Sequence, residues 1–166
     1  MSDGMARVKA VKAGDDFTLD IEWADGTRTK ADLTGLIHSS RHFSVFAEDA
    51  RAFQHVKPVS WGDGIEWENG LDYSANTLKE LADEQKPMSG DYLAKFVARR
   101  KLNNAEAARL LHCTTRTLQS FFKKKELPEY VAFAVRRFEN DPTIFAAHYR
   151  PLAVRPRGRP KALSGD

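Results

Sequence analysis

Cysteine and long apolar runs are both scarce in this sequence of 166 residues. The single cysteine, Cys113, rules out an intrachain disulfide and fits a reducing compartment. The longest apolar run, Tyr130–Val135, is too short to span a bilayer, and Met1–Asp16 lacks the apolar core of a signal peptide. We therefore expect a soluble, cytoplasmic protein with no membrane partner.

Catalytic and metal-binding constellations are also lacking. His38 and His42 are four residues apart, but no cysteine or third histidine lies near them, which favours surface or capping roles over a metal site. Gly62-Asp63-Gly64 indicates a turn and not a phosphate-binding loop. The expectation is a protein that is not an enzyme, has no catalytic residues and uses no metal or other cofactor.

Charge is unevenly distributed along the chain. Residues 1–90 hold 10 Lys and Arg against 16 Asp and Glu, whereas residues 91–166 hold 16 against 7. The two parts carry net charges of −6 and +9, which the +3 of the whole chain conceals. A basic half of this kind predicts contact with a polyanion, and double-stranded DNA is the leading candidate. An anionic membrane is less favoured, because the chain has neither a basic amphipathic stretch nor a lipidation signal.

The first part of the chain predicts a small α+β domain over residues 1–86, built on an antiparallel sheet. Apolar residues alternate from Phe17 to Trp23, and a loop at Ala24-Asp25-Gly26 would pair Ile21 with Thr29 in a hairpin. Further strands are predicted at Arg7–Lys12, Ala52–Ser60 and Gly64–Trp67, followed by a helix from Ser74 to about Gln85. The expected aromatic core comprises Phe17, Trp23, Phe53, Trp61 and Trp67. The acidic residues Asp63, Glu66, Glu68 and Asp72 would repel DNA, so we expect this domain to contact protein.

Several short motifs in this domain resemble a bacterial family. They are Phe17-Thr18-Leu19, Trp23-Ala24-Asp25-Gly26, Asp32-Leu33, Phe53 and Trp67-Glu68-Asn69-Gly70-Leu71-Asp72. In this order they resemble the domain of unknown function family twenty-four forty-two. Members of that family are sometimes fused to a helix-turn-helix, and some lie beside toxin-like genes. The resemblance implies the fold and a bacterial source, and it implies no activity.

Residues 87–149 predict a bundle of five helices, after an interruption at Lys86-Pro87-Met88-Ser89-Gly90. The residues expected to start the five helices are, in chain order: Ser89; Asn103, which forms a capping box with Glu106; Thr114 or Thr115; Pro128; and Asp141-Pro142. The fourth helix is expected to turn Tyr130, Val131, Ala134, Val135 and Phe138 toward a core.

The second and third of these helices have the small and apolar residues of a helix-turn-helix. These are Ala107, Ala108, Leu111, Cys113, Leu118 and Phe121. The segment resembles the phage-repressor-like helix-turn-helix family, in which the second helix enters the major groove. The resemblance assigns base contacts to Thr114, Thr115, Arg116, Gln119, Ser120 and Lys123, and a phosphate contact to Asn104. We assign a further phosphate contact to Lys124. His112 stands where the family usually has glycine. The alternative is an ordinary bundle in which Arg116 and the lysines at 123–125 are a solvated face.

The segment Arg155-Pro156-Arg157-Gly158-Arg159-Pro160-Lys161 resembles an AT-hook. A narrow A·T minor groove has a strongly negative potential and lacks the guanine amino group, so extended arginines fit its floor. We assign Arg157, Gly158, Arg159 and Pro160 to the minor groove, and Arg155 and Lys161 to phosphates. The alternative is a solubilising basic tail, and residues 150–166 are expected to be disordered without DNA.

Two functions remain open at this point. The first is a transcriptional regulator associated with the bacterial nucleoid, binding as a homodimer to paired half-sites with A·T-rich flanks. The second is an antitoxin-like or adaptor protein whose N-terminal domain binds a protein partner while the basic half anchors the complex on DNA. An enzyme acting on DNA is disfavoured, because the carboxylates of the basic half have capping or surface roles.

Overall fold

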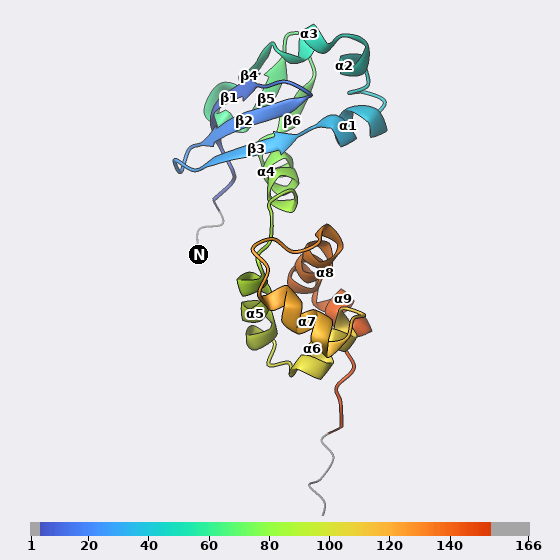
Figure 1. Ribbon diagram of the computed structural model, residues 1–166. Coiled ribbons are helices and arrows are strands. Elements are labelled where there is room, and N and C mark those ends of the chain that lie inside the picture. The colour runs from blue at the N-terminus through green and yellow to red at the C-terminus, as the bar shows by residue number, and fades with distance from the viewer. Residues whose placement is uncertain (1–3, 154–166) are drawn as a thin grey trace, which may run out of the picture. The chain divides into compact units, whose positions relative to one another are not determined.

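The chain has an α+β fold composed of two compact units, Met1–Lys86 and Pro87–Asp166 (Figure 1). The computed structural model describes residues 4–153, so the AT-hook and the rest of the predicted disordered tail beyond 153 lie outside the described residues. Each unit has its own hydrophobic core, and the two cores have no residue in common. The boundary between the units lies in the segment where the charge balance changes sign.

The first sheet has the antiparallel order β1 (Val8–Ala13), β2 (Thr18–Trp23), β3 (Arg28–Asp32). The predicted hairpin register is confirmed, with Ile21 opposite Thr29 and its neighbours paired accordingly. Gly26 has a φ of +85°, which closes the loop and which only glycine adopts readily. Alternation along β2 buries Leu19, Ile21 and Trp23.

A side chain pairs with the backbone at one end of the outer edge of β3. The amide of Gln85 donates to the carbonyl oxygen of Asp32 and accepts its backbone N–H, each at 2.8 Å. Gln85 directly follows α4 (Ala75–Glu84), a helix that lies against β3, β5 and β6 and starts at the predicted cap Ser74 (Figure 1). A helix end therefore pairs with the backbone at the end of the edge strand.

Three short helices connect the sheets, and the prediction of a strand over Ala52–Ser60 is wrong at its start. The helices are α1 (Thr34–Ser39), α2 (Val45–Glu48) and α3 (Ala50–Phe53). The Asp49 carboxylate accepts the N–H groups of Arg51 and Ala52, which starts α3 where the apolar pattern suggested a strand. His38 lies in α1, whereas His42 lies beyond its end, so they do not share a helix.

The second sheet consists of β4 (Val56–Pro58), β5 (Gly64–Trp67) and β6 (Asp72–Ser74). Trp23 and Trp67 are buried as predicted, and their indole N–H groups donate to Thr29 Oγ1 at 2.8 Å and the Phe53 carbonyl at 3.0 Å. The prediction for Trp61 is wrong, since this residue is 84% exposed in the 3-10 turn η1 (Ser60–Gly62). A Cβ at Gly62 would lie 2.5 Å from the Val8 carbonyl oxygen, so the turn packs its glycine inward and leaves Trp61 outside.

The second unit contains five helices in its described part. They are α5 (Gly90–Arg99), α6 (Asn104–Leu110), α7 (Thr115–Phe122), α8 (Glu129–Asn140) and α9 (Pro142–His148). The side chains of Ser89, Asn103, Thr114 and Asp141 cap four of them, as predicted. In α8, Val131, Val135 and Phe138 face the core, but Tyr130 is 65% exposed, so its predicted core position is wrong. On the helix surface, Tyr130 lies beside the stripe of buried residues and not within it. The order of apolar residues in the sequence does not show where the buried stripe ends.

Helix α5 begins against the end of α7, backbone to backbone. The Gly90 N–H donates to the Lys124 carbonyl oxygen at 2.9 Å. A Cβ at Gly90 would lie 2.1 Å from the carbonyl oxygen of Phe121 and 2.6 Å from that of Phe122. Only glycine fits at this approach, which fixes the C-terminal end of α7 relative to α5.

Candidate nucleic-acid interface

Helices α6 and α7 contact each other across a tight turn at 111–114. His112 has a φ of +52°, the left-handed conformation for which glycine is the usual residue. The His112 N–H donates to the Arg109 carbonyl at 3.2 Å, and the Cys113 N–H donates to the Ala108 carbonyl at 2.9 Å. These two bonds form a Schellman motif, so α6 stops sharply although the chain has histidine at this position.

Helix α7 has an apolar side and a polar side. The Thr114 hydroxyl accepts the Thr117 N–H at 3.1 Å and fixes the start of the helix. Leu118 and Phe121 are buried in the core of the second unit. Cys113 in the preceding turn packs against the same core, and its partial burial raises the pKa of its thiol. The polar side carries all six predicted base-contacting residues, each of them exposed: Thr114, Thr115, Arg116, Gln119, Ser120 and Lys123. We refer to Arg116, Gln119, Ser120 and Lys123, which follow one face at three- and four-residue spacing, as the α7 stripe.

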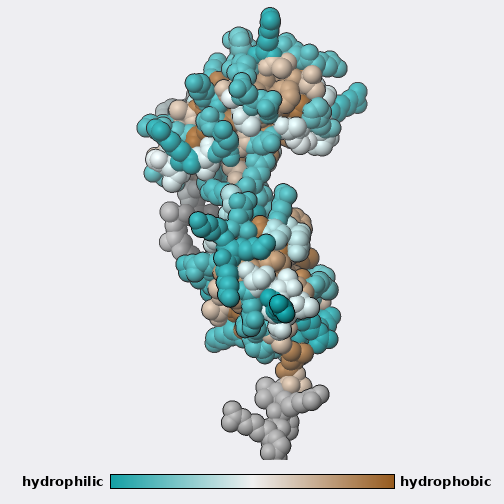
Figure 2. Space-filling model, viewed as in Figure 1, coloured by the Kyte–Doolittle hydropathy of each residue, from teal (hydrophilic) through white to brown (hydrophobic). Residues whose placement is uncertain are grey.

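The cations of the α7 stripe differ from Lys95 and Arg99 of α5 in having no carboxylate partner in the described part of the chain. On α5, Lys95 pairs with Asp91 at 2.9 Å and Arg99 pairs with Glu139. Among residues 4–153, no ion pair or side-chain hydrogen bond holds Arg116 or Lys123. Figure 2 shows hydrophilic residues over much of the front of the C-terminal unit. The positive charge of α7 is therefore not neutralised by any carboxylate among residues 4–153.

The predicted phosphate-contacting residues lie at helix ends. Asn104 is the exposed first residue of α6, directly after the capping residue Asn103. Lys124 follows α7, and its ammonium lies 6.0 Å from the centroid of the Phe121 ring. Arg155, Arg157, Gly158, Arg159, Pro160 and Lys161 lie outside the described residues.

Glu106 joins the start of α6 to the end of the described chain, a contact that the sequence does not predict. One carboxylate oxygen accepts the Asn103 N–H at 3.0 Å and completes the capping box. The other accepts the Leu152 N–H at 3.1 Å and the Tyr149 hydroxyl at 3.4 Å. The N–H groups of Asn103 and Leu152 hold the pKa of this carboxyl below its usual range. Leu152, which belongs to the segment 150–166 that the sequence predicts to be disordered, is thus held at the N-terminal end of α6, three residues before Arg155.

Comparison with known proteins concerns mainly the first unit. Residues 8–84 match the model of a family described as "Protein of unknown function (DUF2442)". These residues form a DUF2442 domain. The predicted resemblance is thereby confirmed, and residues 85–166 lie beyond the DUF2442 match.

Two further comparisons concern the chain as a whole. None of the curated proteins matches it. In structure it is similar to a protein of Nitrosomonas europaea ATCC 19718 described as "Putative DNA Binding Protein NE0471". The two chains are 20% identical with a TM-score of 0.45, over 81% of this chain and 86% of that chain.

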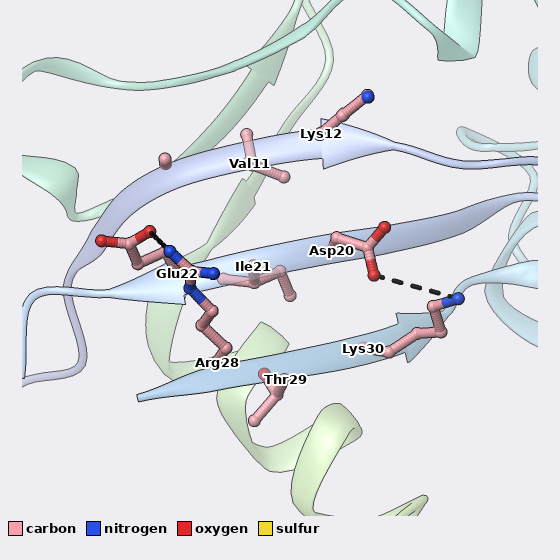
Figure 3. A pocket seen from close by; sticks show the side chains of 9 residues that line it. Val11, Lys12, Asp20, Ile21, Glu22, Arg28, Thr29 and Lys30 are labelled. Carbon is pink, nitrogen blue, oxygen red and sulfur yellow. Dashed lines mark hydrogen bonds and ion pairs between the residues drawn. The ribbon is translucent and has the colours of Figure 1, made fainter. Parts of the chain in front are cut away.

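The outer sheet face of the DUF2442 domain forms a shallow hollow of about 520 Å³ in which acidic and basic residues alternate (Figure 3). Glu22 on the central strand pairs with Lys9 at 2.6 Å and Arg28 at 3.0 Å, and Asp20 lies 3.9 Å from Lys30. The hydrogen bond from Lys9 is the main cause that lowers the pKa of Glu22. The Glu22 carboxylate is thus held ionised by its two basic neighbours, and these ion pairs join the central strand to the strands on either side.

Metal-binding groups and membrane-spanning helices are both absent from the described part of the chain. No three His, Cys, Asp or Glu side chains in residues 4–153 cluster closely enough to hold a metal ion. Within the same residues, every helix is too short or too polar to cross a bilayer.

Proposed function

We propose that the C-terminal unit is a helix-turn-helix DNA-binding domain and that the protein is a transcriptional regulator. The α7 stripe is the observation that carries this proposal. An arginine and a glutamine three residues apart, exposed and without a side-chain partner among residues 4–153, match the donors that read guanine and adenine edges in the major groove. The buried opposite side of α7 holds these side chains on a rigid element.

The charge of the C-terminal unit supports the same proposal. Residues 87–153 hold 12 Lys and Arg against 6 Asp and Glu, before the four further cations of the tail. Contacts to phosphates from Lys123, Lys124 and the start of α6 would supply sequence-independent affinity that weakens with salt. Because Glu106 holds Leu152 at the start of α6, the AT-hook sequence would enter a minor groove next to the site of α7.

The test compares Arg116→Ala with the control Lys95→Ala, which removes one positive charge at a residue already paired with Asp91. A preferred duplex is first selected from random sequences with the full chain, and affinities for it and for a scrambled duplex are then measured by fluorescence anisotropy. Loss of a bidentate arginine–guanine contact should reduce discrimination by about 1–3 kcal/mol, or about 5- to 150-fold. Lys95→Ala should leave discrimination unchanged. Equal discrimination in wild type and Arg116→Ala would refute α7 as the reading helix.

A second candidate is an antitoxin-like or adaptor role for the DUF2442 domain, and Trp61 favours it. This tryptophan is 84% exposed and has a φ of +73°, a strained conformation in a fixed turn. Exposed tryptophans are typical anchors of protein interfaces. A partner that co-purifies with the full chain should be lost with Trp61→Ser, while DNA binding stays intact. Retention of such a partner by Trp61→Ser would exclude this surface.

A further inference from the structure

The solvent-facing side of α8 carries two large aromatic residues that the described part of the unit leaves uncovered. Phe133 is 59% exposed and Tyr130 is 65% exposed, whereas Val131 and Val135 on the opposite side are 1% and 0% exposed. Phe133 lies at the centre of the outward arc, directly away from the buried stripe. Aromatic residues are enriched at protein interfaces, and exposing them to water has a free-energy cost that a partner removes.

The charges flanking Phe133 are arranged symmetrically and with opposite sign. Glu129 lies four residues before Phe133 and Arg137 four residues after it, so all three share one helix face. Both charged side chains are exposed, and neither has an ion pair within residues 4–153. The outward face of α8 therefore runs from acidic, through aromatic, to basic.

We propose that this face binds a second copy of the same chain, with the two α8 helices antiparallel across a two-fold axis at Phe133. In that arrangement the Phe133 rings meet at the axis. Glu129 of each copy lies at the level of Arg137 of the other, about 6 Å along the helix from the centre. A two-fold contact requires a surface complementary to itself, and opposite charges at equal distances from an apolar centre meet that requirement. Duplex DNA is disfavoured here, because Glu129 and the nearby Glu126 would repel phosphates.

The contact is small, so the dimer should be weak and concentration-dependent. Two aromatic side chains from each copy bury less area than the roughly 1,200 Å² of a stable interface. Its link to function rests on the proposed DNA binding, in which paired half-sites would hold two copies close together. Residues of the α7 stripe lie on a different helix and are not used in the contact.

The test is charge reversal at the two flanking positions, followed by sedimentation of the full chain without DNA over a wide concentration range. Wild type should associate reversibly. Glu129→Arg and Arg137→Glu should each weaken association at least about tenfold, because either change places like charges opposite each other twice. The double variant should restore association, and a mixture of the two single variants should form a heterodimer.

Two further measurements keep the result interpretable. Far-UV circular dichroism checks that each reversed variant retains its helices, and Phe133→Ser, which leaves the charges in place, should also abolish association. The proposal is overturned if wild type stays monomeric, if the single variants associate like wild type, or if the double variant does not recover. The sedimentation experiment contains no DNA. A failure of the protein to bind DNA would therefore refute the proposed regulator without contradicting the α8 dimer.

Discussion

Replacing Gly90 with alanine tests how closely the backbone at the start of α5 packs against the end of α7. The new Cβ would lie 2.1 Å from the Phe121 carbonyl oxygen, so the two backbones must separate by more than 1 Å to reach ordinary contact. Overpacking of this kind costs about 1–3 kcal/mol, and the upper part of that range applies because the obstacle is backbone. Alanine regains about 0.5–1 kcal/mol of helix propensity, so a net loss of about 2 kcal/mol is expected. For a unit of this size, the unfolding midpoint should fall by about 8–16 °C.

The assay can separate the two units, because all three tryptophans, at 23, 61 and 67, lie in the first unit. Thermal unfolding followed by far-UV circular dichroism should show the loss, whereas tryptophan fluorescence should report an unchanged transition. The matched control is Gly35→Ala in α1, where a Cβ would meet no atom within 4 Å. That control should leave both transitions unchanged or slightly raised. A Gly90→Ala protein that unfolds like wild type would refute the close approach.

Two further predictions concern α6. His112→Gly should stabilise the C-terminal unit by about 1 kcal/mol in chemical denaturation, since histidine is strained at a φ of +52°; a loss of stability would contradict this. The pKa of Glu106 in the folded state is below its ordinary value of 4.5. Its carboxylate therefore adds to the free energy of unfolding above pH 4.5, and this stabilisation is lost as the pH falls from 4.5 through the lower folded-state pKa. The stability of wild type should therefore decline in this acidic window more steeply than that of Glu106→Gln, and equal pH profiles would show that the carboxylate contributes nothing.

Features encoded by neighbouring residues could be predicted from the sequence. The hairpin register follows from strict alternation and one glycine, and the helix starts at Ser74, Ser89 and Asn103 follow from side chains that cap their own helix. The residues of the α7 stripe are indicated by the resemblance to the helix-turn-helix family, and their three- and four-residue spacing places them on one helix face. In each case the structure satisfies a preference that a few adjacent residues determine.

Features that depend on distant packing could not be predicted. The exposure of Trp61 depends on how closely Gly62 approaches Val8, more than fifty residues earlier. The contact between Glu106 and Leu152 joins residues 46 positions apart. The four-residue helices α2 and α3 are much shorter than the window of about 11 residues over which a helical period can be recognised.

The bond between Gln85 and the edge of β3 has a consequence for the behaviour of the protein at high concentration. An uncovered edge strand is a template on which further strands assemble, and such growth leads to fibrils. Gln85 occupies both hydrogen-bonding groups of Asp32, and the charged side chains of Arg28 and Lys30 flank the rest of the strand. The Gln85 amide thus leaves no free backbone group on Asp32 for an added strand, and charged residues at the remaining exposed positions of an edge strand disfavour such addition.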